Sequence, residues 1–440
     1  MSLAASLAQL WRLRGFRRLA YTRLLSQSGD GVFQVAIATT IFFDPTQAAS
    51  VERIALGFAV LLAPFTLVGP FVGPLIDRWQ RQRIILIGNL IRLGLAGLLL
   101  TVMLTGGPAW LLLTLALLTL SVNRFLLAAM TAGVPQVVPR AQLLTANSVL
   151  PTLGTLAAAL GAAVGGAVTF IAPRISDTNL ASTSLLVAGI AFGLSSSAAM
   201  LLGKRELGPV TTRERLHLAE QFKSLAFELR TGARFLYAAV TPFHGLAVMG
   251  AQRLLYGLMF VASILISRHI LGDPEQPEQA IEKFSLVLLC AAVGFGIAAI
   301  LTPLCGERIG RQQWIVLCLL VGAAGQTLLA ISSDAWAVLS AAAVVSFAVQ
   351  GSKIAVDTIV HRDTTDEVRG RAFTLYDVVY NVAFIASAGI GALVLPDTGY
   401  SRPVMIAIVG AYLLVAAVYS RAPRDPRPLS PTTVRELASE

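Results

Sequence analysis

Long apolar stretches recur along almost the whole of this 440-residue chain. Each is about 20 residues long, which is enough for a helix to cross the hydrocarbon core of a bilayer. Only 13% of the residues are charged, whereas soluble domains carry about 25%. The short alternating segments of a membrane β-barrel are absent from the sequence. Helices are then the remaining structure that satisfies the backbone hydrogen-bonding groups in lipid. The sequence therefore predicts an all-α polytopic membrane protein.

The apolar pattern predicts twelve transmembrane helices. They are expected at residues 19–43, 54–76, 84–105, 109–137, 142–172, 181–202, 239–270, 284–305, 313–332, 335–360, 371–395 and 402–420.

Three polar positions recur about 230 residues further along the chain, which is close to half its length. A constant offset of this kind indicates a duplicated six-helix unit, an arrangement found in one large class of secondary transporters. We therefore expect two pseudo-symmetric bundles, at residues 19–202 and 239–420, joined by a cytoplasmic linker at 203–238. The recurring positions are Asp77-Arg78 with Glu307-Arg308, Arg124 with Lys353, and Asn147 with Asp377.

The distribution of basic residues predicts the orientation in a cytoplasmic membrane. Most of the 34 lysines and arginines fall in the segments that would face the same side as both termini, and cytoplasmic segments carry such an excess. This bias places residues 1–18 and the tail 421–440 in the cytoplasm. It also accounts for much of the net charge of +10, because these basic residues would face the anionic inner leaflet. A nucleic-acid partner is not needed to explain the charge. The opposite side holds only Arg53, Arg174, Arg268, Lys283 and Arg402.

The first residues have the pattern of an interfacial helix. Leu3, Leu7, Leu10 and Trp11 are spaced for one helical face, and several arginines follow them. This order predicts a short helix that lies in the inner membrane interface. A frayed basic tail is the alternative.

Several classes of site and energy source are not indicated by the sequence. Three cysteines and four scattered histidines form no metal-binding or disulfide pattern. No nucleotide-binding loop of the form GxxxxGK followed by Ser or Thr is present. We therefore expect no cofactor, no metal site and no enzyme activity, and a transporter driven by an ion gradient or by its substrate's own gradient.

Five ionisable residues stand out within the predicted spans, where a charge costs roughly 2.5–3.5 kcal/mol near the bilayer centre. They lie on the first and fourth helices of each half, so we expect them to border one shared central cavity. Asp30 is the expected proton-responsive carboxylate, flanked by glycines, with Arg124 as its modulator. The other three are expected to contact substrate or act in gating. These are Arg253, Lys353 and Asp357.

Other interpretations of these charges are open. Snorkelling to the membrane surface is expected for Arg92, which falls nearer the inner end of its span. Lys353 and Asp357 are four residues apart and could form a structural ion pair. Arginines near Asp30 could bind an anion or keep the carboxylate charged, whereas a partly dry Asp30 could exchange protons.

The turn after the second predicted helix carries the most specific motif. Its sequence, GPLIDRWQRQR at 73–83, resembles the G-x-x-x-D-R-x-G-R loop of the major facilitator superfamily, with Gln80 at the second glycine. A second copy, PLCGERIGR, occupies 303–311 between the second and third helices of the other half. The positions that match are Gly73, Asp77, Arg78 and Arg81 in the first copy, and Glu307, Arg308, Gly310 and Arg311 in the second.

Two further segments resemble motifs within this superfamily. SVNRFLLAA around Arg124 is similar to a motif whose arginine is tied to proton coupling. GAAVGG at 161–166 looks like the G-P-x-x-G-G antiporter motif, with Ala162 in place of proline and with Gly161, Gly165 and Gly166 retained. Glycines of this spacing also serve simple close packing of helices. Residues 25–35 and 366–377 are similar to bacterial drug and macrolide exporters.

The resemblance implies two bundles that rock about a central site, with the Asp77 and Glu307 turns as latches on the inner face. Arg371 and Asp377, at the start of the eleventh helix, complete the expected gating set. The expected function is proton-coupled export of small hydrophobic molecules. An importer or anion transporter of the same fold, and a non-transporting membrane receptor on this scaffold, are the alternatives.

Overall fold

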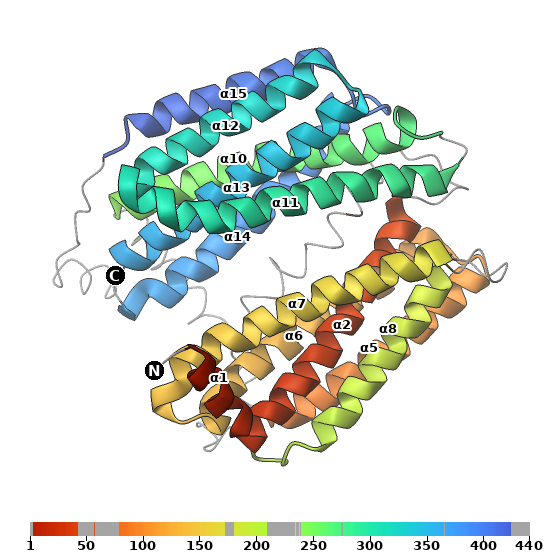
Figure 1. The fold of residues 1–440 in the computed structure, drawn as a ribbon. Helices are drawn as coiled ribbons and strands as arrows, with labels where there is room; N and C mark the ends of the chain where they lie inside the picture. Colours follow the sequence, from red (N-terminus) through yellow and green to blue (C-terminus); the bar gives the residue numbers. More distant parts are fainter. Residues whose placement is uncertain are drawn as a thin grey trace. The chain divides into compact units, whose positions relative to one another are not determined.

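The computed structural model describes residues 3–42, 57, 79–171, 180–208, 234, 237, 239–273, 276–364 and 366–423. Within these residues the regular structure is helical throughout, as the sequence predicts (Figure 1). Ten of the described helices are long and apolar enough to cross a membrane. The second predicted span, 54–76, lies outside the described residues apart from Gly57, which is helical.

The chain divides into two compact units. The helices of the first are α1 (Leu3–Arg12), α2 (Arg14–Phe42), α5 (Arg81–Leu104), α6 (Ala109–Val137), the 3-10 turn η3 (Arg140–Gln142), α7 (Leu143–Ile171) and α8 (Leu180–Met200). Those of the second are α10 (Val240–His269), α11 (Pro277–Ile309), α12 (Arg311–Ile331), α13 (Ala335–Asp363), α14 (Asp366–Val394) and α15 (Arg402–Ser420).

Corresponding helices make corresponding contacts within each unit. In the first unit α5 packs against α6 and α8, and in the second α12 packs against α13 and α15 (Figure 1). Since Arg81 and Arg311 begin α5 and α12 at the offset seen in the sequence, the same three-helix arrangement is built twice. The contacts thus follow the duplication that the sequence indicates.

The two copies of the turn motif differ in backbone conformation. Gly310 lies between α11 and α12 with φ 88° and ψ 139°, a region that only glycine adopts readily. Gln80 precedes α5 with φ −61° and ψ 117°, a conformation open to any residue. This difference explains why the second copy keeps the glycine of the motif and the first copy does without it.

Glycines on α7 allow a close crossing with α2. An added Cβ at Gly161 would lie 2.0 Å from the carbonyl oxygen of Ser28, and one at Gly31 would lie 2.0 Å from that of Ala158. Gly165 also faces α2, with the Cα of Val32 at 3.2 Å from such an atom, whereas Gly166 faces open space. Two of the three motif glycines therefore serve backbone-to-backbone packing.

Candidate functional site

The interior of the first unit contains a buried ion pair. Arg92 of α5 donates from Nη2 to Oδ1 of Asp30 on α2 at 2.6 Å, and the two side chains are 0% and 4% exposed. The guanidinium also lies 3.8 Å from the ring centre of Phe192 on α8. A charged pair so far from water is retained only when its geometry repays the loss of hydration.

This finding corrects the interpretation of Arg92. Snorkelling was expected to carry its head to the inner surface, but the side chain points into the bundle and is fully buried. The signal was present in the sequence: Ile85, Asn89, Arg92 and Ala96 recur at three- and four-residue spacing, and all four are buried on one face of α5. Two polar residues, Asn89 and Arg92, within a stripe of apolar and small residues indicate that this face of the helix points into the bundle.

Neutral polar side chains surround the pair and fix both partners. Gln34 donates from Nε2 to Oδ2 of Asp30 at 2.6 Å. The Nη1 of Arg92 donates to Oγ of Ser26 at 3.2 Å and to Oδ1 of Asn123 at 3.3 Å. Both carboxylate oxygens therefore have donors, and α2, α5 and α6 are joined through a single network in the interior of the unit.

Arg124, the expected modulator of Asp30, lies next to a residue of this network on α6. It follows Asn123 on α6, and it is partly exposed while Asn123 is buried. Asn123 is the α6 residue in the network, since it also accepts a hydrogen bond from Nε2 of Gln27 at 3.1 Å. The ion-pair partner of the Asp30 carboxylate is thus Arg92, which the sequence analysis did not assign to the site.

The second unit contains a cluster of aromatic and charged side chains where α10, α13 and α14 meet. The guanidinium of Arg253 lies 4.1 Å from the ring centre of Tyr380 and 4.0 Å from that of Phe384. These two rings are four residues apart on α14, which places them on one face. Among the described residues Arg253 has no carboxylate partner within ion-pair distance, so aromatic faces hold its charge.

Lys353 and Asp357 complete this cluster from α13. The Nζ of Lys353 donates to Oδ2 of Asp357 at 2.9 Å, and both side chains are about one-third exposed. Lys353 also lies 5.4 Å from the ring centre of Tyr376 and 5.9 Å from that of Tyr380. Tyr380 therefore contacts both cations, and the three substrate-site candidates of the sequence analysis are brought together around it.

Only some of the residues expected to act in gating lie in the described part of the chain. Arg81 donates from Nη1 to the carbonyl oxygens of Ala132 at 3.0 Å and Leu207 at 3.1 Å, so it ties the start of α5 to the end of α6 and to the segment after α8. Asp377 and Arg308 are exposed, and Arg311 is half-buried. Gly73, Asp77 and Arg78 lie outside the described residues, as do the side chains of Glu307 and Arg371.

Relatives of known classification match nearly the full chain. An uncharacterized MFS-type transporter of Mycobacterium tuberculosis is 31% identical over 423 residues, which cover 93% of this chain and 92% of the relative. Its counterpart in Mycobacterium bovis matches equally well. The chain belongs to the major facilitator superfamily. The model of that family matches residues 254–438, and the relatives' names specify no substrate.

Solved structures confirm the fold of this superfamily member. The nucleoside transporter NupG superposes with a TM-score of 0.65, covering 92% of this chain and 97% of NupG at 13% identity. At this identity the match shows the fold alone. The protein is therefore a multi-pass membrane transporter of the superfamily and not an enzyme, as the sequence analysis expected.

Proposed function

We propose that this protein is a proton-coupled exporter of small, largely hydrophobic molecules that works by alternating access. The observation that supports it best is the buried Asp30–Arg92 pair, with its 2.6 Å contact. Ionisable residues inside a membrane bundle are costly and mark ion pathways. Asp30 is the proton-responsive group in this scheme, and Arg92 is the partner that competes with the proton for the carboxylate.

The surrounding network explains how one proton could change the conformation of the unit. When Asp30 is charged, Arg92 links α2 to α5. When Asp30 is protonated, that charge attraction is lost, whereas Arg92 keeps its bonds to Ser26 and Asn123. Protonation therefore removes the charge attraction between α2 and α5 at Asp30 but leaves the weaker bond of Arg92 to Ser26 on α2 in place. A local change of charge of this kind is what biases a conformational switch.

The proposal includes the orientation of the protein in the membrane and the bounds of its two bundles and linker. Both termini and the linker at 203–238 lie in the cytoplasm, because the basic residues concentrate there. Arg124 modulates Asp30 in this scheme. The turns at Asp77 and Glu307 act as latches, and Arg371 and Asp377 belong to the same gating set. The glycine segment on α7 resembles an antiporter motif, with Ala162 in place of its proline, and this resemblance favours exchange of proton for substrate.

Export is tested in cells and in inverted membrane vesicles. Cells that carry the gene should tolerate higher concentrations of some hydrophobic inhibitors in a growth panel than cells that lack it. Inverted vesicles with an acidic interior should accumulate the same compounds, and collapse of the pH gradient should stop accumulation. Uptake in the opposite direction would contradict export, and binding without flux would support the receptor alternative.

The aromatic cluster favours one alternative, an anion transporter of the same fold. Arg253 is held by Tyr380 and Phe384 at 4.0–4.1 Å and has no described carboxylate partner, so its donors suit a substrate carboxylate. Under this alternative Arg253→Gln should weaken binding of an anionic substrate about tenfold or more, measured by competition against a labelled substrate. The exposed Arg402→Gln is the matched control. Equal affinity in Arg253→Gln and wild type would exclude an anion contact at this residue.

A further inference from the structure

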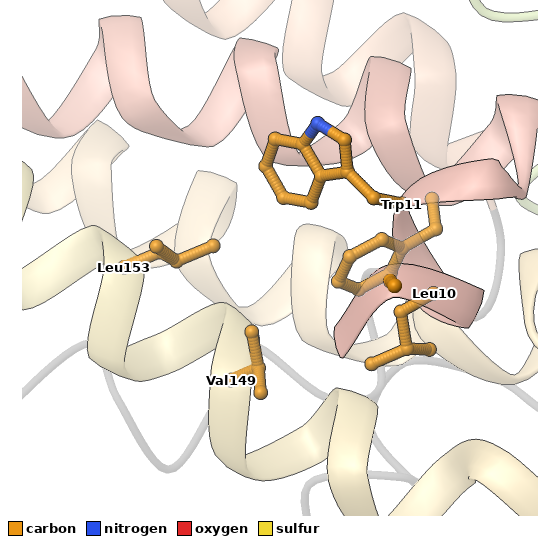
Figure 2. A pocket seen from close by; sticks show the side chains of 6 residues that line it. Leu10, Trp11, Val149 and Leu153 are labelled. Carbon is orange, nitrogen blue, oxygen red and sulfur yellow. The ribbon is translucent and has the colours of Figure 1, made fainter. Parts of the chain in front are cut away.

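An apolar groove opens beside α1 in the first unit. Figure 2 shows Leu10 and Trp11 of α1 facing Val149 and Leu153 of α7. The volume of the groove is about 390 Å³. Its lining carries no charged side chain, and it consists of Ala8, Leu10, Trp11, Phe16, Val149 and Leu153.

The walls of this groove are fixed by packing and hydrogen bonding. Leu10 and Phe16 are buried within the core of the first unit. The ring of Trp11 contacts that of Phe16 edge to face, with centres 6.2 Å apart. Gln142 donates from Nε2 to Oε1 of Gln9 at 3.3 Å, which ties α1 to η3, directly before α7. The groove is therefore a preformed feature of the unit.

An apolar surface continues from the groove along α7. Leu156, Leu160 and Val164 follow Val149 and Leu153 at three- and four-residue spacing, so all five share one helical face. Leu156, Leu160 and Val164 are 56%, 68% and 48% exposed. A flexible hydrocarbon chain that enters the groove would thus find apolar contacts over several further turns of the helix.

Exposed positive charges follow the groove residues Trp11 and Phe16 closely in the chain. Arg12, Arg14 and Arg17 are exposed, and none of them is in an ion pair with another described residue. The next arginine, Arg18, has Glu206 at 3.9 Å. Arg140 is exposed in η3, two residues from the Gln142 that contacts α1. Basic side chains at a membrane surface attract anionic headgroups at about 1 kcal/mol each, or about fivefold in affinity.

We infer that this groove binds an anionic phospholipid of the cytoplasmic leaflet. An acyl chain lies against Trp11, Val149 and Leu153, and the headgroup phosphate contacts Arg14 and Arg17. The charges select the headgroup, and the apolar walls hold the chain. In the orientation proposed above, the site places a lipid at the start of α2, the helix that carries Asp30.

Trp11 provides a direct reporter for this site. Purified protein is reconstituted with rising fractions of phosphatidylglycerol or phosphatidylcholine brominated on the acyl chain. The Trp11 signal is the difference between each protein and the same protein with Trp11→Phe. For the wild type, half-maximal quenching should require about tenfold less phosphatidylglycerol than phosphatidylcholine, and Arg14→Gln/Arg17→Gln should remove most of that difference. The matched control is Arg402→Gln/Arg421→Gln, two exposed arginines of the other unit, and it should behave as the wild type.

A second variant distinguishes lipid binding in the groove from general attraction of anionic lipid to a charged surface. Ala8 lines the groove and is exposed, so Ala8→Phe should fill the space while leaving every arginine in place. Phosphatidylglycerol should then quench Trp11 severalfold less well. Quenching that is equal for both lipids in the wild type, or unchanged by Ala8→Phe, would overturn the inference.

Discussion

Replacing Asp30 with asparagine should abolish uphill transport and markedly destabilise the protein. The substitution leaves the guanidinium of Arg92 fully buried without its charged partner. Breaking a buried pair from one side costs about 3–5 kcal/mol. Thermal unfolding of the purified protein in detergent measures the stability, and substrate accumulation in inverted vesicles measures the transport.

Replacing the other member of the pair, Arg92, gives an internal comparison. Arg92→Gln leaves a carboxylate, which can become neutral by taking up a proton, whereas the guanidinium left by Asp30→Asn cannot lose its charge. Asp30→Asn should therefore unfold at a lower temperature than Arg92→Gln. Uphill accumulation at the wild-type level in Asp30→Asn would contradict the assigned role of this residue.

The double variant Asp30→Asn/Arg92→Gln separates folding from coupling. Both charges are removed together, so neither is left buried without its partner, which is the costly case. The double variant should therefore unfold at a higher temperature than Asp30→Asn, yet still show no uphill accumulation. Recovery of uphill accumulation together with stability would mean that the pair is only structural.

The second large effect is expected at the crossing of α2 and α7. Gly161→Ala would place a Cβ 2.0 Å from the carbonyl oxygen of Ser28, so the two backbones must separate. Overpacking of this kind costs about 1–3 kcal/mol and sometimes more. A lower unfolding temperature and lower yield of folded protein should result, measured by thermal unfolding and size-exclusion chromatography.

Gly166→Ala is the matched control from the same motif. Nothing lies within 4 Å of a Cβ added there, and alanine is a better helix former than glycine by about 0.5–1 kcal/mol. Gly166→Ala should therefore unfold at the wild-type temperature or slightly above it. Equal losses in the two variants would show that close packing with α2 is not the reason for Gly161.

The helices could be predicted closely from sequence because lipid imposes a length on each of them. Predicted boundaries such as 109–137 and 402–420 coincide with α6 and α15. The start of α11 was predicted at 284, but Pro277 begins it. Hydropathy could not indicate those first residues, because they are polar and become helical through the proline at the first position.

The candidate site was harder to predict because pairing depends on which face each helix buries. The i,i+4 contact of Lys353 with Asp357 is local, so spacing alone could suggest it. The contact of Asp30 with Arg92 joins residues 62 positions apart on separate helices. Polarity along the chain showed that the charge of Asp30 was costly, but it suggested snorkelling for Arg92. Only the packing of the helices shows that the two side chains meet, with the guanidinium of Arg92 over the ring of Phe192.

Proton movement across reconstituted membranes tests the central claim most directly. Proteoliposomes with a pH-sensitive dye inside receive a transported compound from the growth panel, with no pH gradient imposed. The wild type should move protons in exchange for the compound, and the folded Asp30→Asn/Arg92→Gln double variant should move none while still exchanging the compound across the membrane. Proton movement of equal size in both proteins would contradict the role of the Asp30–Arg92 pair in coupling.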